Sequence, residues 1–395
     1  MSTRNRICVD VAIVGGGIAG LWLADLLRGR GYSTVLIERS TFGDGQTIRS
    51  QGMIHGGLKY ALAGVLTGAS ESIAAMPARW RDCLRGSGDV DLRGVRVLSE
   101  RYYLWSPNDS AVGRLGGFLA SKVVRGRARR LERSEYPAAF ASPDFRSVVY
   151  ELDELVIDAP SLLNHLAQAQ RGHTISGMVG AEHLQLRNDG SLASIRLRDC
   201  EVTAERFVLT AGAGNEALLN ALAIHEPATQ RRPLHQVMVR RAGLPPLYGH
   251  CVAPLTGSEP RLTVTTHTDQ SGERMWYVGG QLATDGVART DAEQARHAQA
   301  ELAACLPWLD LAGAQFETLR VDRAEPQQHG GRRPDTAFVA AIGNVLACWP
   351  TKLTLAPDLG DKVLAALNCA PSHRAVTDIP DRLTHPGVAV PPWNR

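Results

Sequence analysis

The first forty residues alternate between short apolar runs and a helical repeat. Residues 11–14 form a β-branched run bounded by glycines, which predicts a buried parallel strand. Apolar positions then recur at helical spacing from Leu21 to Leu27 until Gly31, and residues 34–37 form a second apolar run. The pattern therefore predicts a strand, a helix and a second strand that lies parallel to the first.

Similar runs reappear much later in the chain. Residues 206–210 read as a strand that enters a turn of small residues at 211–214. Residues 343–349 offer a further strand, and a Pro-Thr-Lys turn precedes a helix that starts near Ala356 or Pro357. Pro357 suits the first turn of that helix because its fixed φ is already helical.

The region between these runs has a different pattern. Residues 262–266 and 275–278 are β-rich and suit strands of a separate sheet. Residues 291–306 predict an amphipathic helix. Its predicted buried side consists of Ala295, Ala298, Leu302 and Cys305.

Composition and charge narrow the class of protein. The 395 residues are 44% apolar and 21% charged, which is typical of a chain with a full core in two domains or one large α/β assembly. A formal net charge of +3 gives no reason to expect nucleic acid as a partner. The seven cysteines are widely spaced without a CxxC pair, and the histidines lack metal-ligand spacing. We therefore expect no disulfide framework and no metal, and we predict a cytoplasmic protein.

The glycines after the first strand carry a specific chemistry. Gly15, Gly17 and Gly20 stand in the GxGxxG spacing, and Glu38 ends the second strand. Gly15 permits a tight turn, Gly17 lets backbone N–H groups approach a pyrophosphate, and Gly20 lets the helix pack closely on the strand. A carboxylate at the position of Glu38 accepts ribose hydroxyls, which argues against the 2′-phosphate of NADP, although Arg39 lies beside it. These residues predict a dinucleotide site.

The rest of the chain distinguishes FAD from NAD. After Glu38 the sequence enters a Gly-, Ser- and Arg-rich loop instead of a second mononucleotide-binding half. The motifs that follow are RSQGMIHGGLKY (49–60), VIDAPSLLNHL (156–166), VLTAGAG (208–214) and PTKLTLAP (350–357). In this order they resemble the D-amino-acid oxidase superfamily of FAD-dependent oxidoreductases, nearest to its glycerol-3-phosphate dehydrogenase and L-2-hydroxyglutarate oxidase branch. IHGGLKY has lysine where the glycerol-phosphate enzymes have arginine, which puts glycerol 3-phosphate itself in doubt.

The resemblance implies an α/β fold with a Rossmann-like FAD-binding domain built from discontinuous segments and an inserted α+β substrate domain. We predict that residues 1–75, 145–222 and 325–372 form the FAD-binding domain. Residues 76–144 and 223–324 form the predicted substrate domain, and residues 373–395 form a Pro-rich tail along the surface. The FAD-binding residues implied are Gly15, Gly17, Ile18, Ala19, Gly20, Glu38, Arg39, Thr47, Arg49, Ser50, Gly56, Ala211, Gly212, Lys352, Leu353 and Thr354.

The same resemblance places residues 47–60 beside the flavin and the substrate. His55 is the candidate base because its unperturbed pKa lies near neutrality, and a purely structural role in the loop is the alternative. Lys59 and Tyr60 are predicted to meet the substrate, and Tyr60 acts either as a hydrogen-bond donor or as an aromatic lid.

Two further cations are candidates for the site. Arg323 is predicted to grip a carboxylate or phosphate, with Arg320 and Arg333 as competitors. Lys352 is predicted to favour the negative charge of reduced flavin from the turn before a helix, unless it is an exposed lysine. If these cations converge with Lys59, the substrate is a small anion.

The predicted reaction is hydride transfer to FAD from a CH–OH bond of a small anionic metabolite, a 2-hydroxy acid or a polyol phosphate. The alternatives are an amine or amino-acid oxidase acting on a CH–NH bond and an FAD-bearing electron-transfer subunit that needs a partner. The electron acceptor is oxygen, a quinone or a protein. The basic segment 113–133 predicts an amphipathic helix that either contacts the inner face of a membrane peripherally or is only a solvated face.

Overall fold

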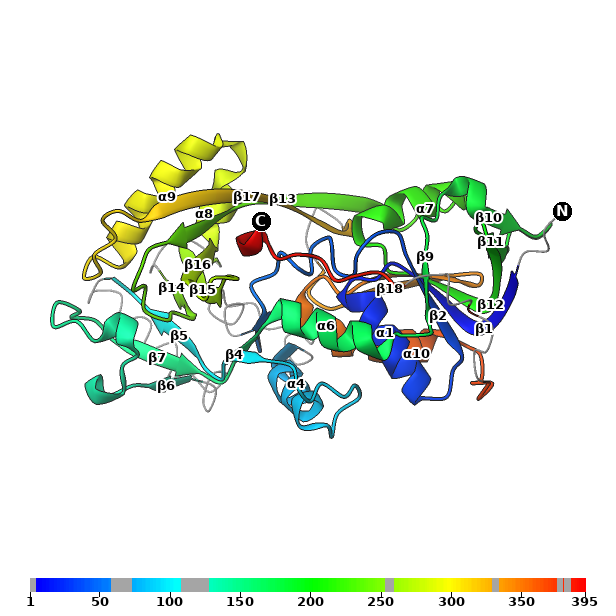
Figure 1. Cartoon of the computed structure of the whole chain (residues 1–395), viewed down its shortest axis with the longest axis horizontal. Coiled ribbons are helices and arrows are strands. Elements are labelled where there is room, and N and C mark those ends of the chain that lie inside the picture. Colours follow the sequence, from blue (N-terminus) through cyan, green and yellow to red (C-terminus); the bar gives the residue numbers. More distant parts are fainter. Residues whose placement is uncertain are drawn as a thin grey trace.

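Two large β-sheets divide the molecule into two lobes (Figure 1). The computed structural model describes residues 5–57, 73–107, 128–252, 259–328, 334–374, 379 and 385–395. Lys59, Tyr60, Arg333 and residues 113–127, which the sequence singled out, lie outside these ranges. Within them, no helix combines the length and apolar character needed to cross a membrane.

The first sheet is built around the predicted strand–helix–strand unit. Its spatial order is β10 (Leu184–Leu186), β11 (Leu192–Arg196), β12 (Cys200–Leu209), β1 (Asn5–Val14), β2 (Thr34–Glu38) and β9 (Thr174–Ser176), while β19 (Val345–Trp349) pairs with β12 and β18 (Phe338–Ile342) with β19. Strands β2, β12 and β19 all run parallel to β1 or to its neighbour. Parallel strands buried on both faces read as continuous apolar runs, which is why the sequence pattern found them.

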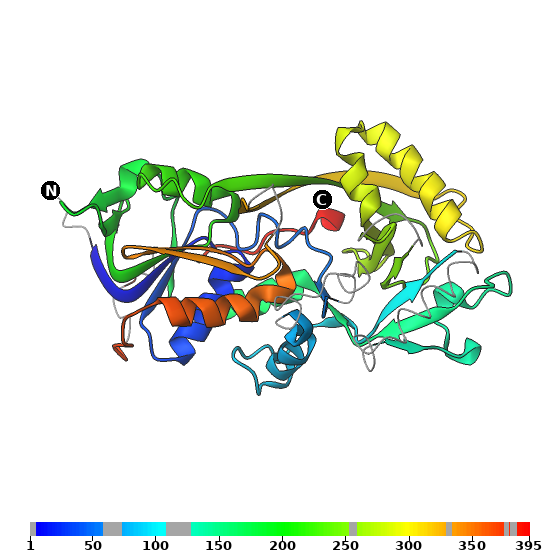
Figure 2. The same ribbon diagram turned by 180° about the vertical axis from the view of Figure 1, so that it is seen from behind.

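Helices cover this sheet on both faces. Helices α1 (Ile18–Gly29), α6 (Ala159–Ala169) and α10 (Ala356–Ala366) share one apolar core, and α7 (Asn215–Ala221) belongs to the core on the other face (Figure 2). Asp158 caps α6 by accepting a hydrogen bond from the Ser161 N–H. Helix α10 begins at Ala356 with a proline in its first turn, as the sequence predicts.

The second sheet makes the core of the other lobe. Its spatial order is β17 (Gln315–Pro326), β13 (Thr229–Arg240), β16 (Arg274–Gly279), β15 (Leu262–Thr268), β14 (Gly249–Cys251), β5 (Tyr102–Trp105), β7 (Val149–Leu152) and β6 (Ala128–Arg130). Helices α8 (Gln281–Asp285) and α9 (Asp291–Cys305) lie against it. Short 3₁₀ turns lie at η1 (Arg133–Glu135), η2 (Ala138–Phe140), η3 (Ala181–His183), η4 (Gly212–Gly214), η5 (Gly286–Ala288), η7 (Leu353–Leu355) and η8 (Pro392–Asn394).

Strands β13 and β17 form a long antiparallel ribbon that spans both lobes (Figure 1). Their pairing runs from Thr229 opposite Pro326 to Arg240 opposite Gln315. At the first end, Arg231 donates to the carbonyl of Ala213, 3.0 Å away, in the small-residue turn of the first lobe. The ribbon therefore ties the second sheet to the turn predicted to hold the cofactor.

The predicted domain boundaries stay a prediction. Strand β7 falls within the range 145–222, which we predicted for the FAD-binding domain, yet it pairs with β5 and β6 in the second sheet. The chain therefore passes between the lobes near β8 (Leu155–Ile157). This strand forms a small third sheet with β3 (Met53–Ile54) and β4 (Val97–Ser99).

Helix α9 confirms the predicted element but corrects its buried side. Ala298, Leu302 and Cys305 are buried as expected, whereas the fourth buried position is Gln294 instead of Ala295. The Gln294 amide donates to the carbonyls of His235 and Leu282, at 2.7 and 3.0 Å. A polar residue on the core face is tolerated there because backbone acceptors satisfy it.

The basic segment 113–133 is only partly described, and its described end, residues 128–133, is not α-helical. Residues 128–130 form β6, which pairs with β7. Arg129 is bound by Glu135 at 2.6 Å and by Glu151 at 3.4 Å, so acids on adjacent elements neutralise it. The expected basic helix is therefore wrong for residues 128–130, because strand pairing and ion pairs fix them instead.

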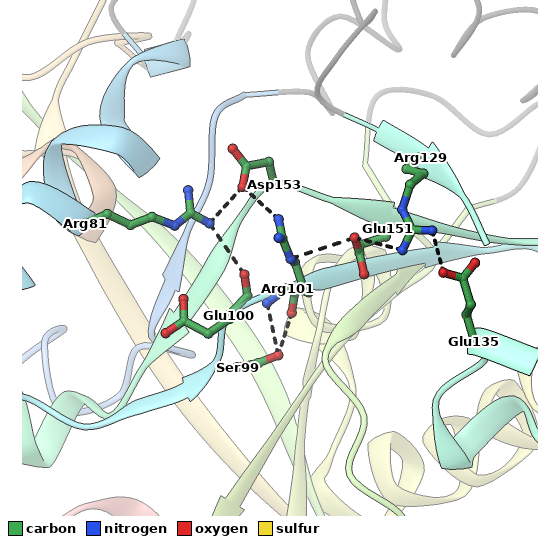
Figure 3. Close-up of polar contacts among 8 residues, drawn as sticks. All are labelled: Arg81, Ser99, Glu100, Arg101, Arg129, Glu135, Glu151 and Asp153. Carbon is green, nitrogen blue, oxygen red and sulfur yellow. Dashed lines mark hydrogen bonds and ion pairs between the residues drawn. The ribbon is translucent and has the colours of Figure 1, made fainter. Parts of the chain in front are cut away.

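Six side chains of alternating sign form what we call the charge ladder, shown in Figure 3. Its members, in order, are Arg81, Asp153, Arg101, Glu151, Arg129 and Glu135. Asp153 Oδ1 lies 3.0 Å from both Arg81 and Arg101. Arg81 belongs to α4 (Met76–Arg85), so the charge ladder connects this helix to the edge of the second sheet.

The C-terminal segment 385–395 packs between the lobes, where the sequence predicted a surface tail. Val388 makes an isolated parallel bridge with Phe42 of the first lobe. Trp393 is buried and stacks on His267 of β15, with ring centroids 4.1 Å apart. Arg240 of β13 donates to the Trp393 carbonyl at 2.7 Å. The buried Trp393 side chain holds this segment against the second sheet, a contact that the proline content does not predict.

Candidate functional site

The turn between β1 and α1 has the tight geometry that its glycines permit. Gly15 has φ +109°, and a Cβ there would lie 2.6 Å from the Ala211 Cα. A Cβ on Gly20 would overlap the carbonyl oxygen of Gly15, so helix and strand pack at a distance that only glycine allows. Helix α1 starts without an acidic residue in its first turn. Its N-terminus is therefore suited to an anion such as a pyrophosphate.

Glu38 is held rigidly beside this turn. Its carboxylate accepts the Gly16 N–H at 2.6 Å and the Ser40 N–H at 2.9 Å. The Ser40 hydroxyl also donates to Oε1, at 3.5 Å, whereas Oε2 accepts only the Gly16 N–H among the described residues, which leaves it a further acceptor position. The residue can therefore accept ribose hydroxyls, as the sequence predicts.

The loop after β2 supplies two hydroxyls, those of Thr47 and Ser50, which differ in their hydrogen bonding. Thr47 Oγ1 accepts the Ile18 N–H at 3.1 Å, so it caps the first turn of α1 and keeps its own proton for donation. Ser50 Oγ is buried and has no hydrogen-bond partner within the part of the chain that the structure describes. A buried hydroxyl normally has a partner, and a molecule bound in the adjoining cavity would supply one. Its position therefore fits a cofactor in the adjoining cavity.

Arg49 is turned toward its own loop. Its guanidinium donates to the Gly45 carbonyl at 2.6 Å and lies 3.6 Å from the carboxylate of Asp44. The Tyr277 hydroxyl shares its single proton between the Arg49 carbonyl, 3.0 Å away, and Gln236 Oε1, 2.6 Å away, which ties the Arg49 backbone to the second sheet. Arg49 therefore shapes the loop at least as much as it offers charge to a cofactor.

A cavity of about 920 Å³ runs from the glycine turn to the second sheet. Of the predicted residues, those lining it are Gly15, Gly17, Ile18, Ala19, Glu38, Arg39, Thr47, Arg49, Ser50, His55, Ala211, Gly212, Arg323, Lys352 and Leu353. Gly20, Gly56 and Thr354 do not line it. The described residues contain no cluster of three or more potential metal ligands, and all seven cysteines are free thiols.

His55 lies on the cavity wall with its backbone fixed on both sides. Its carbonyl accepts the Thr354 hydroxyl at 3.2 Å, and the next N–H, that of Gly56, donates to Glu154 Oε1 at 2.9 Å. His55 itself is buried, with 8% of its surface exposed. Thr354 thus supports the candidate base from behind the wall.

Arg323 and Lys352 approach the same cavity from different elements. Arg323 lies on β17, where its Nε donates to the Arg232 carbonyl at 3.4 Å. Lys352 precedes the η7 turn that leads into α10, and its ammonium lies 3.4 Å from the Asp335 carbonyl. Arg320 also lines the cavity, but its guanidinium clamps the carbonyls of Val287 and Arg289. Arg320 therefore has a structural task, and Arg323, which the sequence predicts for an anion, lines the same cavity.

Some cavity residues were missed in the sequence. Met178 and Val179 line it beside Glu38, whose carbonyl accepts the Gly177 N–H at 2.8 Å. An apolar pair between two glycines after β9 was the only available signal. Gln51 and Gln236 were also missed, because glutamines in a loop and in a strand carry no motif.

The comparisons with known proteins agree on one family. The model of the family described as FAD dependent oxidoreductase matches residues 10–356. A probable FAD-dependent oxidoreductase of Pseudomonas aeruginosa is 51% identical over 395 residues, covering 98% of each chain. The crystal structure of an FAD-dependent oxidoreductase from the same species has a TM-score of 0.84 at 45% identity and covers 99% of both chains.

More distant structures share the fold. The L-alpha-glycerophosphate oxidase of Mycoplasma pneumoniae, solved with FAD bound, has a TM-score of 0.67 at 15% identity and covers 98% of this chain and 99% of that one. The L-amino acid deaminase of Proteus vulgaris has a TM-score of 0.65 at 14% identity, over 93% of this chain and 91% of that one. The predicted recognition, fold class and cofactor are confirmed by these findings.

Proposed function

The chain belongs to the family of FAD-dependent oxidoreductases, and on that premise we propose that it oxidises a CH–OH bond of a small anionic metabolite. The observation that carries this proposal is the shared cavity. The glycine turn and Ser50, which fit FAD, line the same cavity as the cations Arg323 and Lys352 and the candidate base His55. A 2-hydroxy acid or a polyol phosphate combines the required anion with a hydroxyl.

Each residue has a separate task in this mechanism. Bound FAD supplies the hydride acceptor, and the protein binds and orients the substrate. Arg323 holds the carboxylate or phosphate, because a guanidinium binds such groups in a bidentate manner. His55 takes the hydroxyl proton as general base, and its fixed backbone keeps the ring within reach. Lys352 favours negative charge at the edge of the cavity.

Oxidation of a CH–NH bond is the second candidate. The acids Asp322 and Glu259 also line the cavity and would suit an ammonium group. The fold resembles the amino acid deaminase about as closely as the glycerophosphate oxidase. Fold similarity at this level does not choose between the two substrates.

The first experiment is an anaerobic screen of the purified, FAD-loaded protein. Glycerol 3-phosphate, 2-hydroxyglutarate, lactate, glutamate and alanine are mixed with the enzyme, and bleaching of the visible flavin absorbance reports reduction. We expect the hydroxy compounds to bleach the flavin faster than the amino acids. Faster bleaching by amino acids would transfer the assignment to the second candidate.

Replacing Arg323 with glutamine tests the anion site directly. A lost hydrogen bond to a charged group costs about 1.5–3 kcal/mol, so we expect KM for the anionic substrate to rise roughly 10- to 100-fold. Arg274→Gln is the matched control, because Arg274 is exposed at the start of β16 in the same sheet and does not line the cavity. Equal effects of the two substitutions on KM would remove the anion-binding role from Arg323.

A further inference from the structure

Two glutamines, one from each lobe, meet on the cavity wall. Gln51 lies in the loop after β2, and Gln236 lies on β13. The Gln51 amide nitrogen donates to the carbonyls of Thr263 and Tyr277, at 3.1 and 2.8 Å. These two bonds use both protons of the amide, so its Oε1 is the atom left over as an acceptor.

Gln236 is oriented in the opposite sense. The Tyr277 hydroxyl lies 2.6 Å from its Oε1, a length typical of an O–H donor to oxygen and short for a bond to an amide nitrogen. Burial raises the pKa of the Tyr277 phenol, so the hydroxyl keeps its proton. Gln236 is 4% exposed, and its Nε2 is the atom left over as a donor.

Both leftover atoms lie beside the same notch. A Cβ on Gly279 would lie 2.9 Å from Gln51 Oε1 and 3.5 Å from Gln236 Nε2. In the described ranges neither atom has a hydrogen-bond partner. Both residues line the cavity, so a donor and an acceptor held open side by side there suit a ligand group that both accepts and donates.

We infer that Gln236 and Gln51 bind a hydroxyl group of the substrate in the resting complex, with Gln236 Nε2 donating to its oxygen and Gln51 Oε1 accepting a hydrogen bond from its O–H until the proton passes to His55. A hydroxyl both donates and accepts, whereas an ammonium group only donates. The pair therefore selects hydroxy compounds over amino compounds of the same skeleton. This inference rests on the proposed function and adds the residues that set its specificity.

The test measures binding as well as turnover. The hydroxyl probes are 2-hydroxyglutarate and glycerol 3-phosphate. Their matched analogues are glutarate and 3-hydroxypropyl phosphate, each of which lacks only the hydroxyl on the carbon to be oxidised. Dissociation constants come from the perturbation of the visible flavin spectrum, using the rapid phase after anaerobic mixing where a probe is oxidised. The ratio of the two constants in each pair isolates the hydroxyl contribution.

We expect Gln236→Leu to reduce this ratio roughly 5- to 10-fold, the share of one neutral hydrogen bond. Gly279→Ala should reduce it as well, because its methyl group enters the notch. Gln315→Leu is the matched control, an exposed glutamine on the same ribbon outside the cavity. The amount of bound FAD should stay equal to that of the wild type in all three variants.

The outcomes separate the two levels of the proposal. If hydroxy compounds reduce the flavin but Gln236→Leu leaves the ratio unchanged, the inference is overturned and the proposed function stands. Loss of FAD with an unchanged ratio would also overturn it, because the glutamines would then serve the cofactor. If only amino compounds reduce the flavin, both the proposed function and the hydroxyl pair are wrong.

Discussion

His267 is the residue whose burial has the clearest consequence for acid stability. It lies stacked beneath Trp393, and burial lowers its pKa to about 3. In the unfolded chain, the His267 imidazole takes up a proton near pH 6.5. In the folded protein, the same imidazole stays neutral until about pH 3. The stabilising contribution is therefore complete above pH 6.5 and is lost as the pH falls from 6.5 toward 3.

We expect the free energy of unfolding to fall by at most about 1.4 kcal/mol per pH unit from this group over that window. His267→Gln should show a shallower decline between pH 6.5 and 5 in urea unfolding followed by fluorescence. His297→Gln, an exposed histidine on α9, is the control and should keep the wild-type slope. Parallel slopes for His267→Gln and the wild type would contradict the prediction.

At the residue scale, the sequence predicts side chains whose role follows from spacing. Gly15, Gly20 and Glu38 belong to one strand–helix–strand unit of about 25 residues, so their spacing in the sequence is enough to predict their relative positions. Gln236 and Gln51 are brought together by Tyr277 across separate elements. No local pattern encodes such a meeting, so only the folded structure reveals it.

At the scale of elements, the charge ladder joins α4 to the edge of the second sheet. Asp153 is the acid shared by Arg81 and Arg101. We expect Asp153→Asn to destabilise the protein by about 0.5–1 kcal/mol, because a half-exposed ion pair is screened by water. High salt should reduce the difference from the wild type.

The measurement is the urea midpoint at low salt and at 1 M NaCl. Asp310→Asn is the control, since among the described residues Asp310 forms one ion pair, with Arg241, at an exposed position. It should cost less than Asp153→Asn at low salt. A larger loss of stability for Asp310→Asn than for Asp153→Asn would show that sharing Asp153 between two arginines adds no stability.

Elements with a strong hydrophobic periodicity could be predicted from the sequence. The positions that were predicted wrongly within or beside them are polar residues. The periodicity of residues 291–306 indicates a helix, yet it cannot show that Gln294 is buried against backbone carbonyls. The charges of residues 128–130 suggest a helix, whereas pairing with β7 makes them a strand. Tertiary contacts override local preference in both cases.

At the scale of the whole molecule, the segment 385–395 fastens one lobe to the other. Trp393 packs against His267 and Tyr277, and Tyr277 in turn holds the Arg49 carbonyl. We expect Trp393→Ala to lower the free energy of unfolding by about 3–5 kcal/mol, the range for deleting a buried tryptophan. FAD should also be released at a lower temperature, because the loop that carries Ser50 loses its support.

Thermal unfolding followed by circular dichroism and by the fluorescence of released flavin measures both effects. Val390→Ala is the control within the same segment, since Val390 is 48% exposed. An unchanged flavin-release temperature in Trp393→Ala would restrict the segment to a purely structural role.

Only part of the arrangement of the whole molecule could be predicted from the sequence. The order of motifs indicates a discontinuous cofactor lobe, and the sheet order agrees with that indication. The long ribbon of β13 and β17 was not predicted, because partners about 90 residues apart leave no trace in a local window. The position of the C-terminal segment was missed for the same reason.

The order of strands in the first sheet has a consequence for biosynthesis. The glycine turn follows β1 at the beginning of the chain, whereas β19, which completes the parallel strands beside β12, is translated roughly 300 residues later. At about 5–20 residues per second, the ribosome needs on the order of 15–60 s to cover that interval. During this time the nascent chain holds the glycine turn without β19 and the α10 helix that follows it. Stable flavin uptake therefore belongs to the last stage of synthesis or follows chain release.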